Sequence, residues 1–149
     1  MMRFNHMELT FEPGTLTEDF RDRVRSFYGE VFGWVCHDTE ILGQNALLLL
    51  LDERATQFIL LAESPKPMSS PGYDHLGLLQ PSRAAVDELC ERIRTRQETE
   101  PEIRLKVYED LVNPSSTVHA FYVKHLLPIW FDVQSIEYTE PPVRDWHYG

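Results

Sequence analysis

The sequence predicts an α+β fold built from two tandem modules, each in the order strand, helix, strand, strand, strand. Three observations lead to this prediction. A histidine opens a short strand-like segment near the N-terminus, and another opens one in the middle of the chain. A turn and a segment with apolar residues at helical spacing follow each of them. Three more strand-like segments complete each half, so the 149 residues are expected to form one domain from two copies of one unit.

The first module is expected over about residues 4–63. Polar and apolar side chains alternate along residues 5–11, which is the period of a half-buried strand. Further strands are expected over residues 34–37, 45–52 and 57–63. The middle one of these contains a continuous apolar run, which is typical of a strand that is covered on both faces.

The segment after Pro13-Gly14 predicts the helix of the first module. Thr15 and Glu18 have the spacing of a capping box, and Thr17 is the alternative N-cap. Gly33 stands where a glycine commonly ends a helix. A stripe of apolar side chains is expected to face the core. This stripe consists of Phe20, Val24, Phe27, Tyr28, Val31 and Phe32.

The second module is expected over about residues 73–138, after a Ser- and Pro-rich linker at 64–72. Ser82 is the expected N-cap of its helix. The apolar stripe of this helix consists of Val86, Leu89, Cys90 and Ile93. Strands are expected over residues 74–80, 102–111, 117–125 and 129–138. Residues 139–149 are expected to form an irregular tail that wraps the surface.

Composition excludes several classes of partner. The formal net charge of -10 argues against nucleic acid and anionic membranes, because both require a basic surface. Cys36 and Cys90 lack metal or redox spacing, so both thiols are expected to be buried and reduced. The N-terminus lacks the pattern of a signal peptide, and the longest apolar run, residues 46–51, is too short to span a bilayer. A cytoplasmic protein is expected.

Two short motifs carry a resemblance to a known superfamily. The end of the first helix, Phe27 to Gly33, is similar to the pattern Phe-Tyr-x-x-x-Leu-Gly, and Asp74 to Leu78 is similar to the opening strand of a second module. With the repeated element order, the chain resembles the vicinal oxygen chelate superfamily, which includes glyoxalases, bleomycin-resistance proteins and extradiol dioxygenases. The resemblance implies that the modules form a curved, cup-shaped mixed sheet with helices on its outer face.

The resemblance also implies a divalent metal in the cup. Carried over position by position, its ligands are His6 and His75 on the first strand of each module and Asp132 on the last strand of the second module. Aspartate stands here where the family usually has glutamate. The corresponding residue of the first module is Gln57 or Glu63. Two imidazoles and a carboxylate suit iron, manganese, zinc or nickel and leave positions open for a substrate.

Strand alternation indicates which other side chains share the face of these ligands. If Asp132 faces the cup, Trp130 and Gln134 face it too, and both are candidate ligand-binding residues, together with His119 and Gln57. An antiparallel sheet with one wet face would show the same alternation. Candidates for acid–base catalysis near a metal are Glu8, Glu63 and Tyr122.

Two functions fit this pattern. The first is a metal-dependent lyase, isomerase, transferase or dioxygenase that acts on a small oxygen-rich molecule, and the paired histidines favour it. The second is a metal-free binding protein of the bleomycin-resistance kind, with Trp130 stacking on a cationic ligand in the acidic protein. In both cases a homodimer is expected, because the open edges of a small curved sheet need to be covered.

Overall fold

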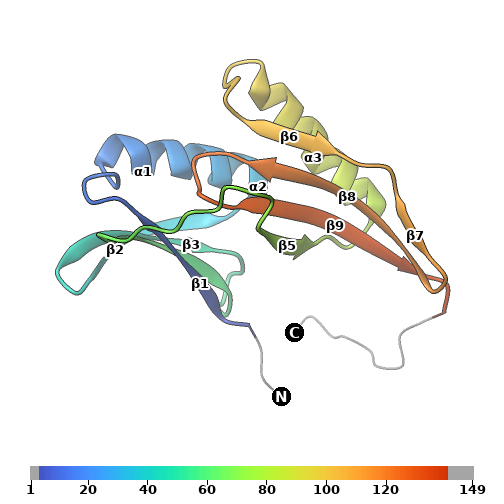
Figure 1. The fold of residues 1–149 in the computed structure, drawn as a ribbon, viewed down its shortest axis with the longest axis horizontal. Helices are drawn as coiled ribbons and strands as arrows, with labels where there is room; N and C mark the ends of the chain where they lie inside the picture. Colours follow the sequence, from blue (N-terminus) through green and yellow to red (C-terminus); the bar gives the residue numbers. More distant parts are fainter. Residues whose placement is uncertain (1–3, 141–149) are drawn as a thin grey trace. The chain divides into compact units, whose positions relative to one another are not determined.

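The computed structural model describes residues 4–140, which form two compact units. The first unit contains residues 4–72 together with Leu126–Pro128, and the second contains Tyr73–His125 and the described residues from Ile129 onward. Each unit holds one module of the predicted kind, and the α+β fold of strand–helix–strand–strand–strand modules is confirmed (Figure 1). The predicted tail lies almost entirely outside the described residues.

The first unit is a four-stranded mixed sheet with a helical segment. Its strands lie in the order β1, β4, β3, β2, with β1 parallel to β4 and the other pairs antiparallel. Its elements are β1 His6–Phe11, α1 Glu18–Val24, η1 Arg25–Gly29, α2 Glu30–Phe32, β2 Val35–Ile41, β3 Gln44–Leu50 and β4 Phe58–Glu63. Strand β2 is longer than predicted and turns into β3 through Leu42 and Gly43, which both have positive φ.

The second unit is a five-stranded mixed sheet with one continuous helix. Its main path is β5, β9, β8, β6, with β5 parallel to β9, and β7 also pairs with β8. Its elements are β5 His75–Leu79, α3 Arg83–Gln97, β6 Arg104–Val107, β7 Leu111–Asn113, β8 Ser116–Lys124 and β9 Trp130–Tyr138. Helix α3 packs along β8 and β9 (Figure 1).

The prediction of one unbroken strand over residues 102–111 is wrong. The structure divides this segment into β6 and β7, with residues 108–110 outside the ladder. The Asp110 carboxylate at this break accepts hydrogen bonds from Arg83 and interacts with His119. These side-chain partners hold the chain where a strand would otherwise continue, and local sequence pattern does not reveal them.

The helix caps follow the sequence closely. Thr17, the alternative candidate, is the N-cap of α1, and its Oγ1 accepts a hydrogen bond from the Phe20 N–H at 3.2 Å. Ser82 caps α3 in the same way through the Ala85 N–H, also at 3.2 Å. Gly33 ends the first helical segment in the left-handed conformation, with φ of 74°.

The first helical segment is not a regular α-helix throughout. Five residues in its middle, Arg25–Gly29, form a π-helical turn between α1 and α2. The wider turn carries two large buried aromatic side chains, Phe27 and Tyr28, whose rings meet edge to face at 5.0 Å. A sequence-derived stripe at α-helical spacing does not predict this turn, because the stripe assumes one regular pitch along the whole segment.

One face of each sheet forms a core to which the helix of that unit contributes side chains. In the first unit the buried sheet residues are Leu9, Leu47, Leu49, Ile59 and Leu61, and those of the helical segment include Val24, Phe27 and Tyr28. In the second unit they are Phe121, Val123, Phe131 and Val133 opposite Val86, Leu89, Cys90 and Ile93. Between residues 4 and 140, no helix is long and apolar enough to cross a membrane.

Candidate functional site

The second unit brings His75 and Asp132 together. Strands β5 and β9 are parallel, with His75 opposite Trp130 and Gly77 opposite Asp132. The His75 Nε2 atom lies 3.9 Å from Asp132 Oδ2, which is too long for a hydrogen bond. The Nδ1–H of His75 donates to the backbone carbonyl of Tyr73 at 2.8 Å, so Nε2 carries the lone pair. His75 therefore presents its acceptor nitrogen toward the carboxylate.

Asp132 lies in a partly apolar setting. The residue is 8% exposed, and within residues 4–140 its Oδ1 atom has no hydrogen-bond partner. Burial raises the pKa of Asp132, and the charge of His75 and a hydrogen bond from Tyr122 offset part of that rise. Gly77, directly opposite, adds no side chain beside the carboxylate. An unpartnered buried carboxylate oxygen beside an imidazole lone pair is a donor set that a cation can satisfy.

Tyr122 completes this group from the neighbouring strand. It lies opposite Asp132 in the β8–β9 pair, and its ring meets His75 edge to face at 5.0 Å. Burial raises the pKa of Tyr122, and the adjacent Asp132 charge and hydrogen bond raise it further. The phenol therefore stays protonated and can donate a proton or a hydrogen bond at neutral pH.

Aromatic rings and cations cover the same sheet face, which we call the His75 face and which carries His75, Tyr122, Trp130 and Asp132. The Arg104 guanidinium lies 4.6 Å from the Trp130 ring centre, and Tyr73 stacks on the same indole at 5.3 Å. Trp130 is 2% exposed, so its ring is already covered. The predicted stacking of a cationic ligand on Trp130 therefore has no open ring surface to use.

Two lysines extend this positive region. Lys106 Nζ lies 4.3 Å from the Tyr73 ring centre and donates a hydrogen bond to its hydroxyl. Burial and the nearby Arg104 charge lower the pKa of Lys124, which is paired with Arg104 across β6 and β8. Three cations thus lie on one face of a protein whose net charge is -10. This face favours an anionic ligand over a cationic one.

Gln134 also lies on the His75 face. A Cβ added at Gly77 would be 3.2 Å from its Nε2 atom, so the Gln134 amide occupies the space beside the glycine. Its place near Asp132 is compatible with the predicted ligand-binding role.

The first unit repeats the histidine arrangement. The Nδ1–H of His6 donates to Asn5 Oδ1 at 2.9 Å, and the Asn5 amide donates in turn to the Thr56 carbonyl at 2.8 Å. This leaves Nε2 of His6, like that of His75, with the lone pair. The His6 ring stacks on Phe58, its parallel partner, with centres 4.9 Å apart and planes at 7°.

The carboxylate is not repeated. Asp132 lies opposite the residue two after His75, and the equivalent position in the β1–β4 pair is Leu60, opposite Glu8. Neither predicted alternative falls there. Glu63 lies at the end of β4, where its Oε1 accepts the Leu16 N–H at 2.7 Å, and Gln57 precedes the strand and is exposed. Leu60 is buried and offers no metal ligand.

His119 lies on the opposite face of the second sheet from Trp130 and Asp132. His119 is three residues before Tyr122 on β8, so the two side chains point to opposite faces of the sheet. Its Nε2 lies 2.8 Å from Asp87 of α3, and its Nδ1 lies 2.8 Å from Asp110. Burial lowers the pKa of His119, but the hydrogen bonds to Asp110 and Asp87 outweigh it, so the net shift is upward. The structure therefore places His119 in an ion-pair network rather than near His75.

Arg83 holds that network together. It binds Asp110 through both terminal nitrogens and also Glu137, and the pKa of Asp110 falls to about 2 because of Arg83 and His119. A small cavity of about 60 Å³ lies against the network, and it is lined in part by Asp87, Cys90 and His119. The Cys90 thiol there has a pKa raised by burial, which argues against a reactive thiolate.

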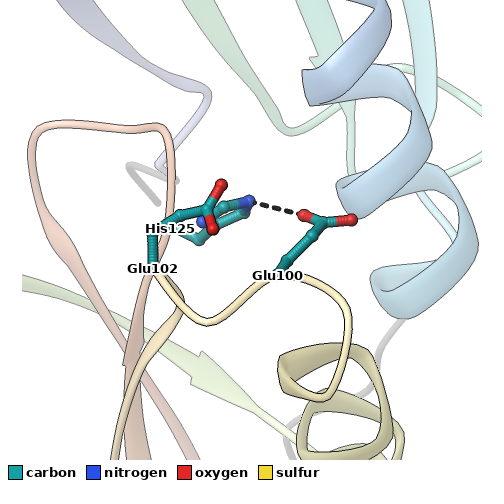
Figure 2. A group of neighbouring side chains, drawn as sticks. All are labelled: Glu100, Glu102 and His125. Carbon is teal, nitrogen blue, oxygen red and sulfur yellow. Dashed lines mark hydrogen bonds and ion pairs between the residues drawn. The ribbon is translucent and has the colours of Figure 1, made fainter.

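A second group of potential metal ligands was not predicted from the sequence. Glu100, Glu102 and His125 each offer one donor atom, and these three atoms lie within 4.8 Å of one another (Figure 2). They could hold a metal ion. Only the alternation of Glu100 and Glu102 hints at such a site in the sequence, because their proximity to His125 depends on how the loop after α3 meets the end of β8.

Comparison with known proteins rests on structure. No protein-family model matches the sequence, and no curated protein matches it significantly. The structure is similar to FosX, a fosfomycin resistance protein from Listeria monocytogenes solved with Mn(II) and sulfate. The TM-score is 0.62 at 15% identity, over 91% of this chain and 90% of that chain. This is the vicinal oxygen chelate fold.

Two further proteins share the vicinal oxygen chelate fold with this chain. An integron cassette protein from Vibrio cholerae has a TM-score of 0.59 at 11% identity, over 91% of this chain and 95% of that chain. TnmS3, an antibiotic binding protein from a Streptomyces species, has a TM-score of 0.61 at 14% identity, over 92% and 98%. At these identities the similarity establishes the fold and leaves the function to the site.

Proposed function

We propose that this protein is a divalent-metal-dependent enzyme that acts on a small, oxygen-rich, anionic molecule. The observation that carries the proposal is the His75–Asp132 pair. The buried Oδ1 of Asp132 has no hydrogen-bond partner among the described residues, and the acceptor Nε2 of His75 lies 3.9 Å from the other oxygen, Oδ2. Among the reaction classes of the fold, a lyase, isomerase, transferase or dioxygenase would all use such a centre. FosX, which shares the fold, was solved with Mn(II).

The donor set fits a metal ion. Ligand distances of about 2.0–2.2 Å allow two donors up to about 4 Å apart to share one ion, so the 3.9 Å between His75 and Asp132 is within reach. The hydrogen bond from His75 Nδ1 to the Tyr73 carbonyl orients the ring as outer-shell partners of metal-bound histidines do. His6, in the first unit, has the same Nδ1 arrangement, which leaves its Nε2 as the acceptor.

The cations of the His75 face support an anionic substrate. Arg104 and Lys106 lie on the same side of the sheet as Asp132, and both pack on aromatic rings that keep them in place. FosX has also been solved with Mn(II) and a dihydroxypropylphosphonic acid, a molecule with paired oxygens and a negative charge. We therefore expect a phosphonate, phosphate or carboxylate group on the substrate.

The protein's own groups would supply proton transfer. A bound metal would act as a Lewis acid on a substrate oxygen. Tyr122, protonated and beside Asp132, is placed to donate a proton to an oxygen that develops negative charge. Glu8 remains the predicted base, since it is exposed on the same strand face as His6, whereas Glu63 is occupied by the Leu16 amide.

The test is metal analysis of protein purified without a His tag or chelator. We expect His75→Ala and Asp132→Asn each to lose one equivalent of iron, manganese, zinc or nickel relative to the wild type. His37→Gln, which changes an exposed histidine of β2, is the matched control and should retain it. Equal metal content in wild type and His75→Ala would overturn the proposal.

A metal-free binding protein is the second candidate, and one observation favours it. Four aromatic side chains, Tyr73, Tyr108, Tyr122 and Trp130, make ring contacts on or beside the His75 face. TnmS3, an antibiotic binding protein, shares the fold. Tryptophan fluorescence titrations with aromatic anions, repeated after dialysis against a chelator, distinguish the two functions. Binding that survives chelation without any turnover would favour sequestration.

A homodimer is also proposed. Among the strands between residues 4 and 140, β7 pairs only with β8, and Leu111 and Val112 on it are 61% and 73% exposed. Apolar side chains on such a strand favour contact with another copy. Light scattering at micromolar concentration should give twice the chain mass of 17.5 kDa, and a monomer would remove this proposal.

A further inference from the structure

The loop after α3 and the end of β8 bring three potential ligands together within the second unit. Glu100 and Glu102 lie between α3 and β6, and His125 directly follows β8. The His125 side chain is 1% exposed, and its Nε2 lies 2.9 Å from Glu100 Oε2. Figure 2 shows the Glu100 carboxylate directed at the imidazole, with Glu102 next to the same ring. A buried imidazole thus meets two carboxylates.

The spacing suits a shared ion. Two ligands at about 2.1 Å in adjacent positions around a metal are about 3 Å apart, close to the observed 2.9 Å between His125 and Glu100. Glu102 offers the third donor atom, and all three donor atoms lie within 4.8 Å of one another.

Arg96 binds one carboxylate oxygen of Glu100. Its Nε donates to Glu100 Oε1, whereas His125 meets Oε2. A carboxylate that binds a metal through one oxygen is commonly fixed by a hydrogen bond to the other. Arg96 therefore orients Glu100 as an outer-shell partner would, and Oε2 of this carboxylate meets His125.

We propose that Glu100, Glu102 and His125 bind one divalent cation of the zinc or manganese class, separate from the His75–Asp132 centre. The mixed oxygen and nitrogen donors select this class over calcium or magnesium. The ion would fix the loop after α3 to the end of β8. This point has structural consequence, because the next residues, Leu126–Pro128, belong to the first unit. The site is a structural clamp and takes no part in the proposed reaction.

The experiment counts Zn²⁺ bound to the full chain by equilibrium dialysis. Glu102→Gln and His125→Gln should each lose one equivalent, or weaken it at least 100-fold, while Asp132→Asn retains that equivalent. Glu98→Gln is the matched control, since it makes the same change on an exposed glutamate of the same segment. Undiminished Zn²⁺ binding in both Glu102→Gln and His125→Gln would overturn the proposal.

Thermal unfolding keeps the test valid if His125→Gln folds poorly. Zn²⁺ should raise the melting temperature of the wild type and of Glu98→Gln, because an ion that binds only the folded state stabilises it. The rise should be absent or reduced in Glu102→Gln, whose substitution is on the surface. Arg96→Ala should weaken Zn²⁺ binding about 10- to 100-fold. An equal rise in wild type and Glu102→Gln would count against the clamp.

Discussion

The two modules share a histidine but place their carboxylates on different strands. In both, the histidine opens the first strand and donates through Nδ1 to an oxygen, which leaves Nε2 as the acceptor. In the second module the acidic residue, Asp132, lies on the last strand opposite Gly77. In the first it is Glu8 on the first strand, opposite Leu60. One register position therefore decides whether the sheet face of a module carries an adjacent imidazole and carboxylate.

The ring contacts of the two histidines also differ. His6 stacks flat on Phe58, whereas His75 meets Tyr122 only by its edge, with planes at 76°. Flat stacking covers the ring face, while edge contact leaves the ring plane directed toward Asp132. The two modules thus share the histidine and its tautomer, and they differ in the residue on the strand opposite it.

The largest expected effect comes from giving the first module the carboxylate of the second. Leu60→Asp places an unpaired charge at a site that is 7% exposed. We expect the free energy of unfolding to fall by about 3 kcal/mol. Urea unfolding measures it, with the volume-conserving Leu60→Met as control, which should cost less than about 1.5 kcal/mol. Wild-type stability in Leu60→Asp would mean that the two positions are equally tolerant of charge.

The reciprocal change gives the second module the leucine of the first. Asp132→Leu should weaken metal binding by at least about 100-fold, equal to about 2.7 kcal/mol. Calorimetric titration with Mn²⁺ measures this, and Asp132→Glu, with the residue usual in the fold, should retain binding. Tight Mn²⁺ binding in Asp132→Leu would contradict the assignment of Asp132 as ligand.

Without metal, replacing the Asp132 carboxylate by a neutral amide should stabilise the folded protein. The folded protein raises the pKa of Asp132, so its ionised form opposes folding once the pH exceeds the unfolded value of about 3.9. Asp132→Asn should therefore gain stability over the metal-free wild type at pH 7 and lose that advantage near pH 3. Thermal unfolding in chelator at both pH values tests this, and an advantage that does not change with pH would contradict it.

Helix capping is expected to matter by about 1 kcal/mol in each module. Thr17→Ala and Ser82→Ala each remove one side-chain acceptor from a helix N-terminus. The loss should be larger for Ser82, because it begins the continuous α3, whereas α1 passes into the π-turn after seven residues. Thermal unfolding of both variants measures this, with Thr17→Ser and Ser82→Thr as controls. A larger loss at Thr17 would reverse the comparison.

The smallest expected effect is a pH dependence that only the second module provides. The folded pKa of His119 is raised, so its contribution to stability is complete below the unfolded value of about 6.5 and is lost as the pH rises through the folded value. We expect less than about 1 kcal/mol, because the carboxylates are partly exposed. In His119→Gln the free energy of unfolding should no longer change with pH between pH 6 and 8. In Asp87→Asn this pH dependence should be smaller than in the wild type. An unchanged pH dependence in His119→Gln would mean that other groups cause it.

The local sequence pattern predicted the modules well. It failed where side chains distant in sequence determine the structure. Alternation in β1 and the caps at Thr17, Ser82 and Gly33 follow from neighbouring residues, and the structure confirms them. The break between β6 and β7 depends on Arg83, which is distant in sequence.

The ligand position of the first module could not be found by a fixed offset. The parallel partner of His6 is Phe58 and that of His75 is Trp130, so the two modules differ in the length of chain between these strands. The cover on Trp130 by Arg104 and Tyr73 was equally hidden, because alternation gives the face of a residue and not its neighbours.

The π-turn at Arg25–Gly29 has a consequence for how the modules tolerate changes in length. A π-turn contains one residue more than an α-turn, so deleting one residue there would convert it to regular helix with little rotation of the segments on either side. The same deletion inside α3 would rotate everything after it by about 100° and turn the stripe of Val86, Leu89 and Ile93 away from its sheet. The first helical segment therefore contains a position where one residue can be lost without changing which side chains face the sheet. Helix α3 contains no such position.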